Sequence, residues 1–357
     1  MTRALVAMSG GVDSSVAAAL LLEQGYEVVG ATMKLWGGPS DTGCCSVADV
    51  EDARRVCQQL GIAHHVFNFT AEFERDVVGP YVSAHARAST PNPCIACNAH
   101  LKFDRFWERA KLLGFDFIAT GHHARVSAGA GTWYLRRGRD GAKDQSYVLY
   151  MLGQAQLAGL KLPVGEMTKD NVRRLAFQRA LRTAAKPDSQ DVCFIPRTGG
   201  RESFLGDRTR LGPGRMVATS GEDLGPVDHL ELLTVGQRRG LGLSATTALG
   251  RRYVLDVDLR SRTATVGALD ELVVNQLPVA EACWATGAVP AGARAEAQLS
   301  AHGRPVTGVW QPAAGSGGAR GTFLLDEPTR RVAPGQAVVF YQPDPAGDIV
   351  LGGGTAV

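Results

Sequence analysis

The chain has 357 residues, which predicts two or three domains, and its 45% hydrophobic and 20% charged residues are ordinary for a globular protein with a sizeable core. A formal net charge of +3 is too small for the whole molecule to attract nucleic acid, so local basic patches would have to bind any such partner. No apolar run approaches the roughly 20 residues of a membrane span, and the first residues lack the features of a secretory signal, so we expect a cytoplasmic protein with no membrane partner.

Short apolar runs alternate with helical patterns in the first half of the chain. The pattern predicts strands at 3–8, 27–33, 64–69 and 115–122, and helices at 12–25, 46–61 and 99–114. The helix at 46–61 starts with a Ser-x-x-Asp signal, and its apolar residues recur at helical spacing. This strand–helix alternation predicts a parallel sheet with helices on both faces.

The pattern changes near residue 200. Pro and Gly recur from there on, helical periodicity fades, and short strand-like runs follow, including 230–236 and a hairpin pattern at 247–272. Residues 312–321 are predicted to form a flexible loop. We therefore expect an α/β domain at 1–205, a small β-rich domain at 206–277 and a β-barrel-like domain at 278–357, with the last boundary near Leu277–Pro278.

The stretch SGGVDSS (9–15) lies between the first predicted strand and the first helix. Ser9, Gly10 and Gly11 let backbone N–H groups approach a phosphate, and the helix N-terminus adds its positive end. Asp13 is suited to organise a metal–phosphate complex. The stretch is neither a Walker A loop, since no lysine follows the glycines, nor a dinucleotide fingerprint. The plain alternative is a turn without a ligand.

The seven cysteines of the chain are an odd number, and without a secretory signal they argue against a disulfide framework. Cys57 falls on the apolar face of a predicted helix and is expected in the core. Cys283 is expected to be structural. Cys44 and Cys45, in a Gly-rich stretch, have no assignment.

Cys94 and Cys97 form a Cys-x-x-Cys pair behind two prolines in TPNPCIACN (90–98). Such a pair is compatible with structural zinc, with a redox pair or with two unreactive thiols, although zinc needs four ligands and no second pair exists. A further interpretation pairs it with Cys193, which is expected on a loop leading into a short strand. One thiol would then carry sulfur as a persulfide, and the other would release it.

Seven motifs occur in the order seen in the tRNA-specific 2-thiouridylases, which the chain resembles over essentially its whole length. They are SGGVDSS (9–15), GATMKLW (30–36), TPNPCIACN (90–98), IATGHHAR (118–125), KDQSYVLYML (143–152), DSQDVCFIP (188–196) and TVGQRRGLGL (234–243). The first motif is also that of the ATP pyrophosphatase superfamily, whose enzymes cut ATP between its α and β phosphates. The resemblance implies a PP-loop, Rossmann-like, adenine-nucleotide-binding catalytic domain followed by two small all-β modules.

The resemblance also implies a reaction, in which the O2 atom of the wobble uridine of tRNA, position 34, is replaced by sulfur. Adenylation of O2 makes AMP the leaving group, and sulfur comes from a cysteine persulfide, giving 2-thiouridine, AMP and pyrophosphate. The implied cofactors are ATP and Mg²⁺ that accompanies ATP, with no resident metal. The implied partners are the anticodon stem-loop of tRNA and a cysteine desulfurase or sulfur-relay protein that donates persulfide sulfur.

The same resemblance assigns roles to single residues. Cys97 matches the nucleophile and Cys193 the persulfide carrier, with a transient disulfide between them, and Asp13 is placed among the catalytic residues. The positions implied for ATP are Ala7, Met8, Ser9, Gly10, Gly11, Val12, Asp13, Ser14, Met33 and Gly121. Those implied for the target base are Asn92, Pro93 and Cys94, and those for the rest of the tRNA are His122, Lys143, Asp144, Gln145 and Gln336.

Two departures from the family pattern affect these assignments. Some members carry Asp where Cys94 stands, and an Arg-Tyr pair common in the last module corresponds here to Ser300 and Ala301. Four basic clusters are predicted to track phosphates, the alternative for each being a solvated face. They are 135–139, 171–182, 208–215 and 237–240.

Three other hypotheses remain open from the sequence. An iron–sulfur cluster on Cys94, Cys97 and Cys193 would keep the reaction but change its sulfur chemistry. Another ATP pyrophosphatase, such as an amidotransferase-type synthetase, would need neither Cys97 nor Cys193. An RNA-binding protein with a zinc-bound Cys-x-x-Cys would turn over no ATP.

Overall fold

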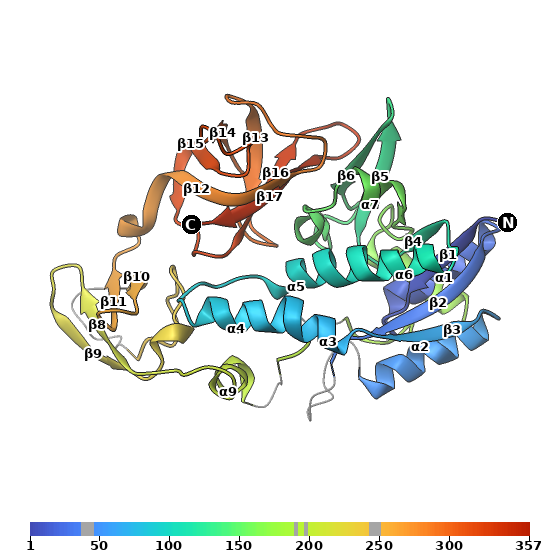
Figure 1. Cartoon of the computed structure of the whole chain (residues 1–357), viewed down its shortest axis with the longest axis horizontal. Coiled ribbons are helices and arrows are strands. Elements are labelled where there is room, and N and C mark those ends of the chain that lie inside the picture. The colour runs from blue at the N-terminus through green and yellow to red at the C-terminus, as the bar shows by residue number, and fades with distance from the viewer. Residues whose placement is uncertain (37–45, 189–191, 196–198, 243–250) are drawn as a thin grey trace.

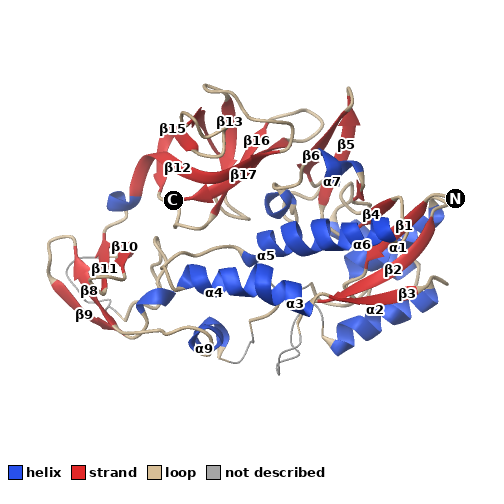
Figure 2. Ribbon diagram, viewed as in Figure 1, coloured by secondary structure: helices blue, strands red, loops and turns tan. Residues whose placement is uncertain are grey.

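The computed structural model describes residues 1–36, 46–188, 192–195, 199–242 and 251–357. Cys44 and Cys45 therefore lie outside the described residues, as do parts of the motifs at 188–196 and 234–243. The described residues form three β-sheets, and the third contains two strands from the first half of the chain beside the strands of its C-terminal part (Figure 1 and Figure 2). No helix among them is long and apolar enough to cross a bilayer.

The first sheet is parallel and has the strand order β3–β2–β1–β4–β7. Its strands are β1 (Arg3–Ala7), β2 (Glu27–Lys34), β3 (His64–Asn68), β4 (Phe117–Ala119) and β7 (Leu160–Lys161). From β1 the chain adds β2 and β3 on one side of the sheet, and then β4 and β7 on the other side. In open parallel sheets, ligands bind beside such a switch in strand order, at the carboxyl ends of the strands.

Helices cover both faces of this sheet, as predicted. Residues Ala4 and Val6 of β1 pack in one core with α1 (Val12–Glu23) and α2 (Val47–Gln59). The alternate residues Leu5 and Ala7 pack in the other core, with the side chains of residues 97–110. The helix predicted at 46–61 is confirmed at its start, where the Ser46 side chain accepts a hydrogen bond from the backbone N–H of Asp49.

The remaining helical segments up to residue 206 are short. They are α3 (Thr70–Phe73), η1 (Glu74–Val78), α4 (Gly79–His85), α5 (Pro93–Ala96), η2 (Cys97–Arg105), α6 (Phe106–Leu112), η3 (Ser146–Leu149), α7 (Gln154–Ala158), α8 (Lys169–Gln178) and α9 (Gly200–Gly206). The helix predicted at 99–114 is confirmed as one continuous rod, but its first part, η2, is π-helical and only α6 is α-helical. Such wider turns are frequent at functional sites.

The second sheet has four strands in the order β10–β11–β8–β9. They are β8 (Gly214–Ala218), β9 (Asp223–Val227), β10 (Tyr253–Asp258) and β11 (Thr263–Gly267). The predicted hairpin is confirmed by the antiparallel pairing of β10 with β11. The strand predicted at 230–236 is wrong, because η4 (Leu230–Leu232) is a 3₁₀ turn that buries Leu230 beneath this sheet and leaves no partner strand.

The third sheet closes on itself. Strands β12 (Val273–Trp284), β15 (Gly321–Arg330), β14 (Val306–Pro312), β13 (Arg294–Gln298), β16 (Ala337–Gln342) and β17 (Ile349–Ala356) follow one another, and β12 also pairs with β17. The result is a six-stranded antiparallel barrel around Trp310 and Phe340. Strand β12 crosses residues 277–278 without a break, so we propose that the last unit begins near 273; the other predicted domain limits also remain proposals.

A hairpin from the first half of the chain extends the barrel. It consists of β5 (Ala124–Gly129) and β6 (Thr132–Arg137), and β6 pairs with β17 where Arg136 meets Ile349. Figure 1 shows the hairpin beside β16 and β17, above the helices of the first domain. The first domain and the barrel are therefore joined by a shared sheet, although more than 200 residues separate β6 from β17 in the chain.

Arg137 fastens this junction. Its guanidinium donates to Asp348 at 3.0 Å, to Asp144 at 3.1 Å and to Gln298 at 2.7 Å, and it lies 3.6 Å from the ring centre of Tyr341. The charge of Arg137 is therefore used inside the protein, and contact of the cluster 135–139 with phosphates remains a prediction.

We expect Arg137→Met to destabilise the protein by about 3 kcal/mol, because it leaves the Asp144 carboxylate, only 6% exposed, without its cation. Urea unfolding followed by tryptophan fluorescence measures this change. Arg139, which is exposed, supplies the control Arg139→Met. Equal unfolding midpoints for the two variants would show that the junction does not depend on this ion pair.

Candidate nucleotide and thiol site

The glycine loop lies where β1 ends and α1 begins, as the sequence predicts. Gly10 has a φ of +70°, and a Cβ atom at this position would collide with the carbonyl oxygen of Asp49. Glycine is therefore required twice over, by its backbone conformation and by the close approach of α2. Gly11 caps α1 without a side chain, so the first turn of the helix faces the site with its backbone N–H groups.

The buried serines Ser14 and Ser15 fix the conformation of the loop through hydrogen bonds to its backbone. The Ser14 hydroxyl accepts from the backbone N–H of Ser9 at 3.2 Å and donates to the Gly11 carbonyl at 3.2 Å. The Ser15 hydroxyl donates to the same carbonyl at 2.8 Å. Since Ser14 and Ser15 are both buried, these hydroxyls shape the turn in the described structure, and direct contact of Ser14 with ATP remains a prediction.

Gly121 and Met33 flank the same loop. A Cβ atom on Gly121 would collide with the backbone of Asp13 and Ser14, so the chain after β4 lies directly against the start of α1. Met33 belongs to β2, which pairs with β1 up to the match of Ala7 with Ala31, and it is 8% exposed. The residues predicted for ATP therefore meet at one edge of the sheet, and their contact with ATP remains a prediction.

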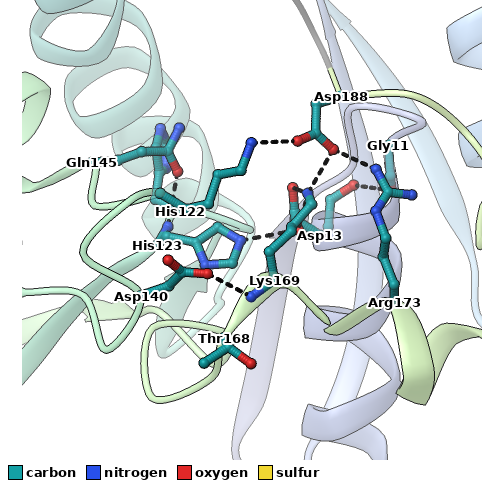
Figure 3. A network of polar contacts seen from close by, with 12 residues as sticks. Gly11, Asp13, His122, His123, Asp140, Gln145, Thr168, Lys169, Arg173 and Asp188 are labelled. Carbon is teal, nitrogen blue, oxygen red and sulfur yellow. Dashed lines mark hydrogen bonds and ion pairs between the residues drawn. The ribbon is translucent and has the colours of Figure 1, made fainter. Parts of the chain in front are cut away.

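Asp13 stands at the centre of a network of charged groups, shown in Figure 3. Lys169 donates to both of its carboxylate oxygens, at 2.8 and 2.7 Å, and the Nε2 atom of His123 lies 3.1 Å from Oδ1. Lys169 also lies 3.0 Å from a carboxylate oxygen of Asp188, which pairs in addition with Lys143 at 2.8 Å.

The network keeps its two carboxylates ionised. Burial favours a higher pKa for Asp13, but the hydrogen bonds from His123 and Lys169 outweigh it and hold the pKa below its ordinary value. Burial also opposes ionisation of Asp188, and the ammonium groups of Lys143 and Lys169 hold its pKa far lower still. The site therefore carries fixed charges of both signs at neutral pH.

A second lysine, Lys186, holds the glycine loop on the side that faces α2. The Nζ atom of Lys186 donates to the Gly10 carbonyl at 2.9 Å, to Asp49 at 2.6 Å and to Asp52 at 2.8 Å. Burial favours a lower pKa for this lysine, but the two aspartates raise it. Lys186 thus holds the loop against α2 as a cation.

The sequence does not reveal Lys169 or Lys186 as parts of the site. The lysine of a Walker A loop is recognised by its spacing from the glycines, whereas these two follow the glycines by more than 150 residues. Lys169 lies in no motif, and Lys186 stands at the start of the segment 186–196, where Cys193 is the residue that attracts attention. The one signal that bears on them is that both fall between the motif at 143–152 and Cys193.

In the described structure both carboxylate oxygens of Asp13 accept hydrogen bonds from Lys169, and a part for Asp13 in a metal–phosphate complex remains a prediction. Among the described residues, which include Cys94, Cys97 and Cys193, no group of three or more His, Cys, Asp or Glu side chains is arranged to hold a metal ion. The residues therefore suit a Mg²⁺ ion that is held mainly by the phosphates of ATP.

The thiol pair lies at the junction of α5 and η2. The Asn92 side chain caps α5 by accepting a hydrogen bond from the Cys94 backbone N–H at 3.0 Å, and Pro93 occupies the first turn. Cys97 follows directly and is 8% exposed, whereas Cys94 is half-buried. The two thiols thus differ in environment, although their sequence positions look equivalent.

Cys193 is held through its neighbour Phe194. The Phe194 ring is 2% exposed, and its centre lies 5.6, 5.4 and 5.2 Å from those of Phe73, Tyr81 and Phe204. Cys193 packs against the same hydrophobic cluster that contains Cys97. The structure therefore gathers both predicted working thiols around one core, 96 positions apart in the chain.

The short strand predicted after Cys193 is wrong for the described residues 192–195, which form a turn. Val192 has a φ of +51°, a left-handed conformation that is strained for a β-branched residue. The aromatic anchoring of Phe194 explains how the segment can keep this conformation, since burial of the ring opposes relaxation of the backbone.

Most residues predicted to contact tRNA have internal partners. Asp144 pairs with Arg137, and the Gln145 side chain accepts from the His123 backbone N–H at 2.8 Å. His122 is 8% exposed, its Nδ1 lies 2.7 Å from the Thr120 hydroxyl, and burial lowers its pKa far enough to keep it neutral. Contact of these residues with tRNA remains a prediction.

Two further basic clusters also pair internally in large part. In 171–182, Arg173 pairs with Asp188, Arg179 with Glu23 and Arg182 with Asp52; in 208–215, Arg208 stacks on Phe204 and Arg215 pairs with Asp223. In the cluster 237–240, both arginines, Arg238 and Arg239, are exposed and form no ion pair within the described residues. This last cluster is the best candidate of the four for a phosphate-tracking surface.

Comparison with known proteins gives matches along the whole chain. Residues 2–197 match the family described as "tRNA methyl transferase HUP domain", and residues 277–356 match the "Aminomethyltransferase beta-barrel domain". The chain is 43% identical over 360 residues to the tRNA-specific 2-thiouridylase MnmA of Mycolicibacterium smegmatis, covering 99% of both chains. It is 45% identical over 366 residues to the protein of the same name from Carboxydothermus hydrogenoformans, covering 99% of this chain and 97% of that one.

Proposed function

The chain belongs to the tRNA-specific 2-thiouridylases, and from this premise we propose how its residues carry out ATP-dependent 2-thiolation of uridine in tRNA. Two domain descriptions mention methyl transfer, but relatives similar over 97% or more of their length are thiouridylases, and they decide the class of enzyme. The protein is a tRNA sulfurtransferase. The detailed proposal is supported by one observation. The start of α1, whose backbone N–H groups suit a phosphate, lies in the same domain as Cys97 and Cys193, which share one hydrophobic core.

We propose that the first step adenylates the target uridine at position 34. The backbone N–H groups at the start of α1 bind the phosphates of ATP, and Lys169 neutralises the charge that gathers beside Asp13. Uridine O2 attacks the α phosphorus, and the bond between the α phosphorus and the bridging oxygen breaks. Pyrophosphate then leaves toward the loop, where the backbone N–H groups at the start of α1 would hold it, and a Mg²⁺ ion that arrives with ATP would further neutralise its charge.

The second step transfers sulfur. A cysteine desulfurase or sulfur-relay protein first leaves a persulfide on Cys193, and the sulfur replaces AMP at C2 either as the persulfide itself or as released sulfide. In both orders the Cys97 thiolate attacks the Cys193 sulfur and breaks the persulfide bond. The products are 2-thiouridine, AMP and a Cys97–Cys193 disulfide, which a thiol reductant reopens.

The target base has to leave its stack to reach this site. In an anticodon loop the cost is below the few kcal/mol of a paired duplex. Asn92, Pro93 and Cys94 lie on the approach to Cys97, which supports their proposed contact with the base. The exposed Arg238 and Arg239 suit the phosphates of the same stem-loop.

Mass spectrometry of tRNA tests this function directly. Nucleosides from a strain that lacks the gene are expected to contain no 2-thiouridine at the wobble position, and a plasmid copy of the gene is expected to restore it. Purified protein with tRNA, ATP and a persulfide donor should form AMP and 2-thiouridine in equal amounts. Normal 2-thiouridine in the deletion strain would refute the proposal.

Cys94 is expected to assist without being essential. It stands where some relatives carry Asp, so we propose that it handles a proton beside the reacting base. Cys94→Ser keeps a proton donor at this place and should lower kcat about tenfold, and Cys94→Ala about a hundredfold. Single-turnover thiolation measures both. Equal rates for the two variants would exclude proton transfer by this side chain.

A further inference from the structure

Thr90, four residues before Cys94, is a meeting point of all three parts of the chain. Its backbone N–H donates to the Pro334 carbonyl of the barrel at 2.8 Å, and its carbonyl accepts a hydrogen bond from the side-chain amide of Gln336. Its hydroxyl lies 3.2 Å from that of Thr234, which belongs to the segment between the second sheet's strands. The barrel thus satisfies both backbone groups of Thr90.

The fit between these two segments is tight. Gly335 has a φ of +89°, and a Cβ atom there would collide with the Ser89 hydroxyl and the Thr90 backbone nitrogen. The Ser89 hydroxyl donates to the Pro334 carbonyl at 3.2 Å. Only glycine allows the barrel to approach the loop this closely, so the contact is a built feature of the fold.

The backbone between Thr90 and Cys97 has little conformational freedom. Pro91 and Pro93 fix two of the intervening φ angles, and the Asn92 cap fixes the start of α5. Helix α5 then leads without interruption into η2 at Cys97. A shift at Thr90 is therefore passed on as a movement of the helix that carries both thiols.

We propose that the barrel loop Pro334–Gln336 positions Cys97, with Gln336 as the positioning residue whose amide holds Thr90. The inference rests on the proposed function for its kinetic consequence, because a misplaced Cys97 would attack the persulfide more slowly. According to this proposal, the barrel does more than bind tRNA: it also holds in place the segment of the first domain that carries Cys97. The resemblance assigns Gln336 to tRNA, and the two roles predict different measurements.

The test compares Gln336→Met, which keeps the side-chain length but removes the donor, with Gln342→Met at the exposed far end of β16. Alkylation of Cys97 by iodoacetamide, followed peptide by peptide in the absence of tRNA, reports the position of the loop. We expect Cys97 to react about fivefold faster in Gln336→Met than in Gln342→Met, the effect of losing one hydrogen bond. The kcat for thiolation should fall, with KM for tRNA unchanged.

An unchanged alkylation rate would overturn the proposal, whether KM for tRNA rises, as for a tRNA contact, or stays the same. Ser89→Ala removes the hydroxyl that donates to the Pro334 carbonyl of the same barrel loop and provides a second variant if Gln336→Met does not fold, with faster alkylation again expected. Alkylation needs no substrate, so it decides the positioning role independently. A wild-type protein that thiolates no tRNA would instead refute the proposed function.

Discussion

Cys193→Ser and Cys97→Ser are each expected to lower the rate of tRNA thiolation by at least ~10³-fold, because each removes a sulfur atom whose bonds change during the reaction. Adenylation should survive in both variants, since neither thiol belongs to the glycine loop. AMP-linked tRNA or exchange of pyrophosphate into ATP would therefore persist without product. The separation of these two half-reactions is the signature of thiols that act after adenylation.

Cys97→Ser and Cys193→Ser should differ in whether a persulfide accumulates on the protein. With a persulfide donor, Cys97→Ser is expected to accumulate a persulfide on Cys193, visible as the mass of one added sulfur atom on that peptide. Cys193→Ser should carry no such sulfur on Cys97. After a single turnover, the wild type should instead contain the Cys97–Cys193 disulfide.

Cys283→Ser is the matched control. Cys283 is half-buried in β12 of the barrel, and burial raises the pKa of its thiol, so it suits a structural role. This variant should thiolate tRNA at the wild-type rate. Full activity of Cys193→Ser would refute the persulfide assignment. A different result would favour an iron–sulfur cluster: a brown wild-type protein whose Cys94→Ser variant is colourless and inactive.

The sequence predicts those parts of the molecule that have local patterns. Strand β1, the glycine turn and α1 follow from an apolar run, small residues at a turn and helical spacing, and all three stand where they are expected. The hairpin β10–β11 is found for the same reason. The 3₁₀ turn at Leu230–Leu232 is missed, since a short apolar run can be buried by a turn as well as by a strand.

Contacts between distant segments have no local pattern and could not be predicted. Arg137 reads as part of a basic cluster until the barrel brings Asp348 and Gln298 to it. Lys169 belongs to none of the motifs of the sequence, and only the folded domain brings Asp13 beside it. The candidate site is therefore predicted in its glycines and cysteines, and missed in the cations that balance its charge.

Lys169→Met is expected to lower kcat/KM for ATP by about a hundredfold. The substitution removes the cation that lies on both oxygens of Asp13, and an uncompensated carboxylate repels the phosphates that must bind beside it. Release of AMP and pyrophosphate measures the effect. Lys111→Met, at an exposed position on α6, is the control and should leave kcat/KM unchanged.

The same variant should change the pH dependence of stability. The pKa of Asp13 in the folded protein lies below its ordinary value of 3.8, so the ionised carboxylate stabilises the fold above that pH, and this contribution is lost as the pH falls through the folded pKa. The difference in unfolding free energy between wild type and Lys169→Met should thus be larger at neutral pH than in acid. A constant difference would mean that Lys169 does not stabilise the Asp13 anion.

A double variant separates the two roles of Lys169. If the lysine serves only to neutralise Asp13, Asp13→Asn should restore both the stability and the ATP affinity of Lys169→Met, because the amide needs no counter-ion. If Lys169 also binds the phosphates, stability should return while KM for ATP stays high. We expect the second result, since Lys169 pairs with Asp13 in the first turn of α1, beside the backbone N–H groups proposed to bind the phosphates, whereas Lys186 pairs with Asp49 and Asp52 of α2.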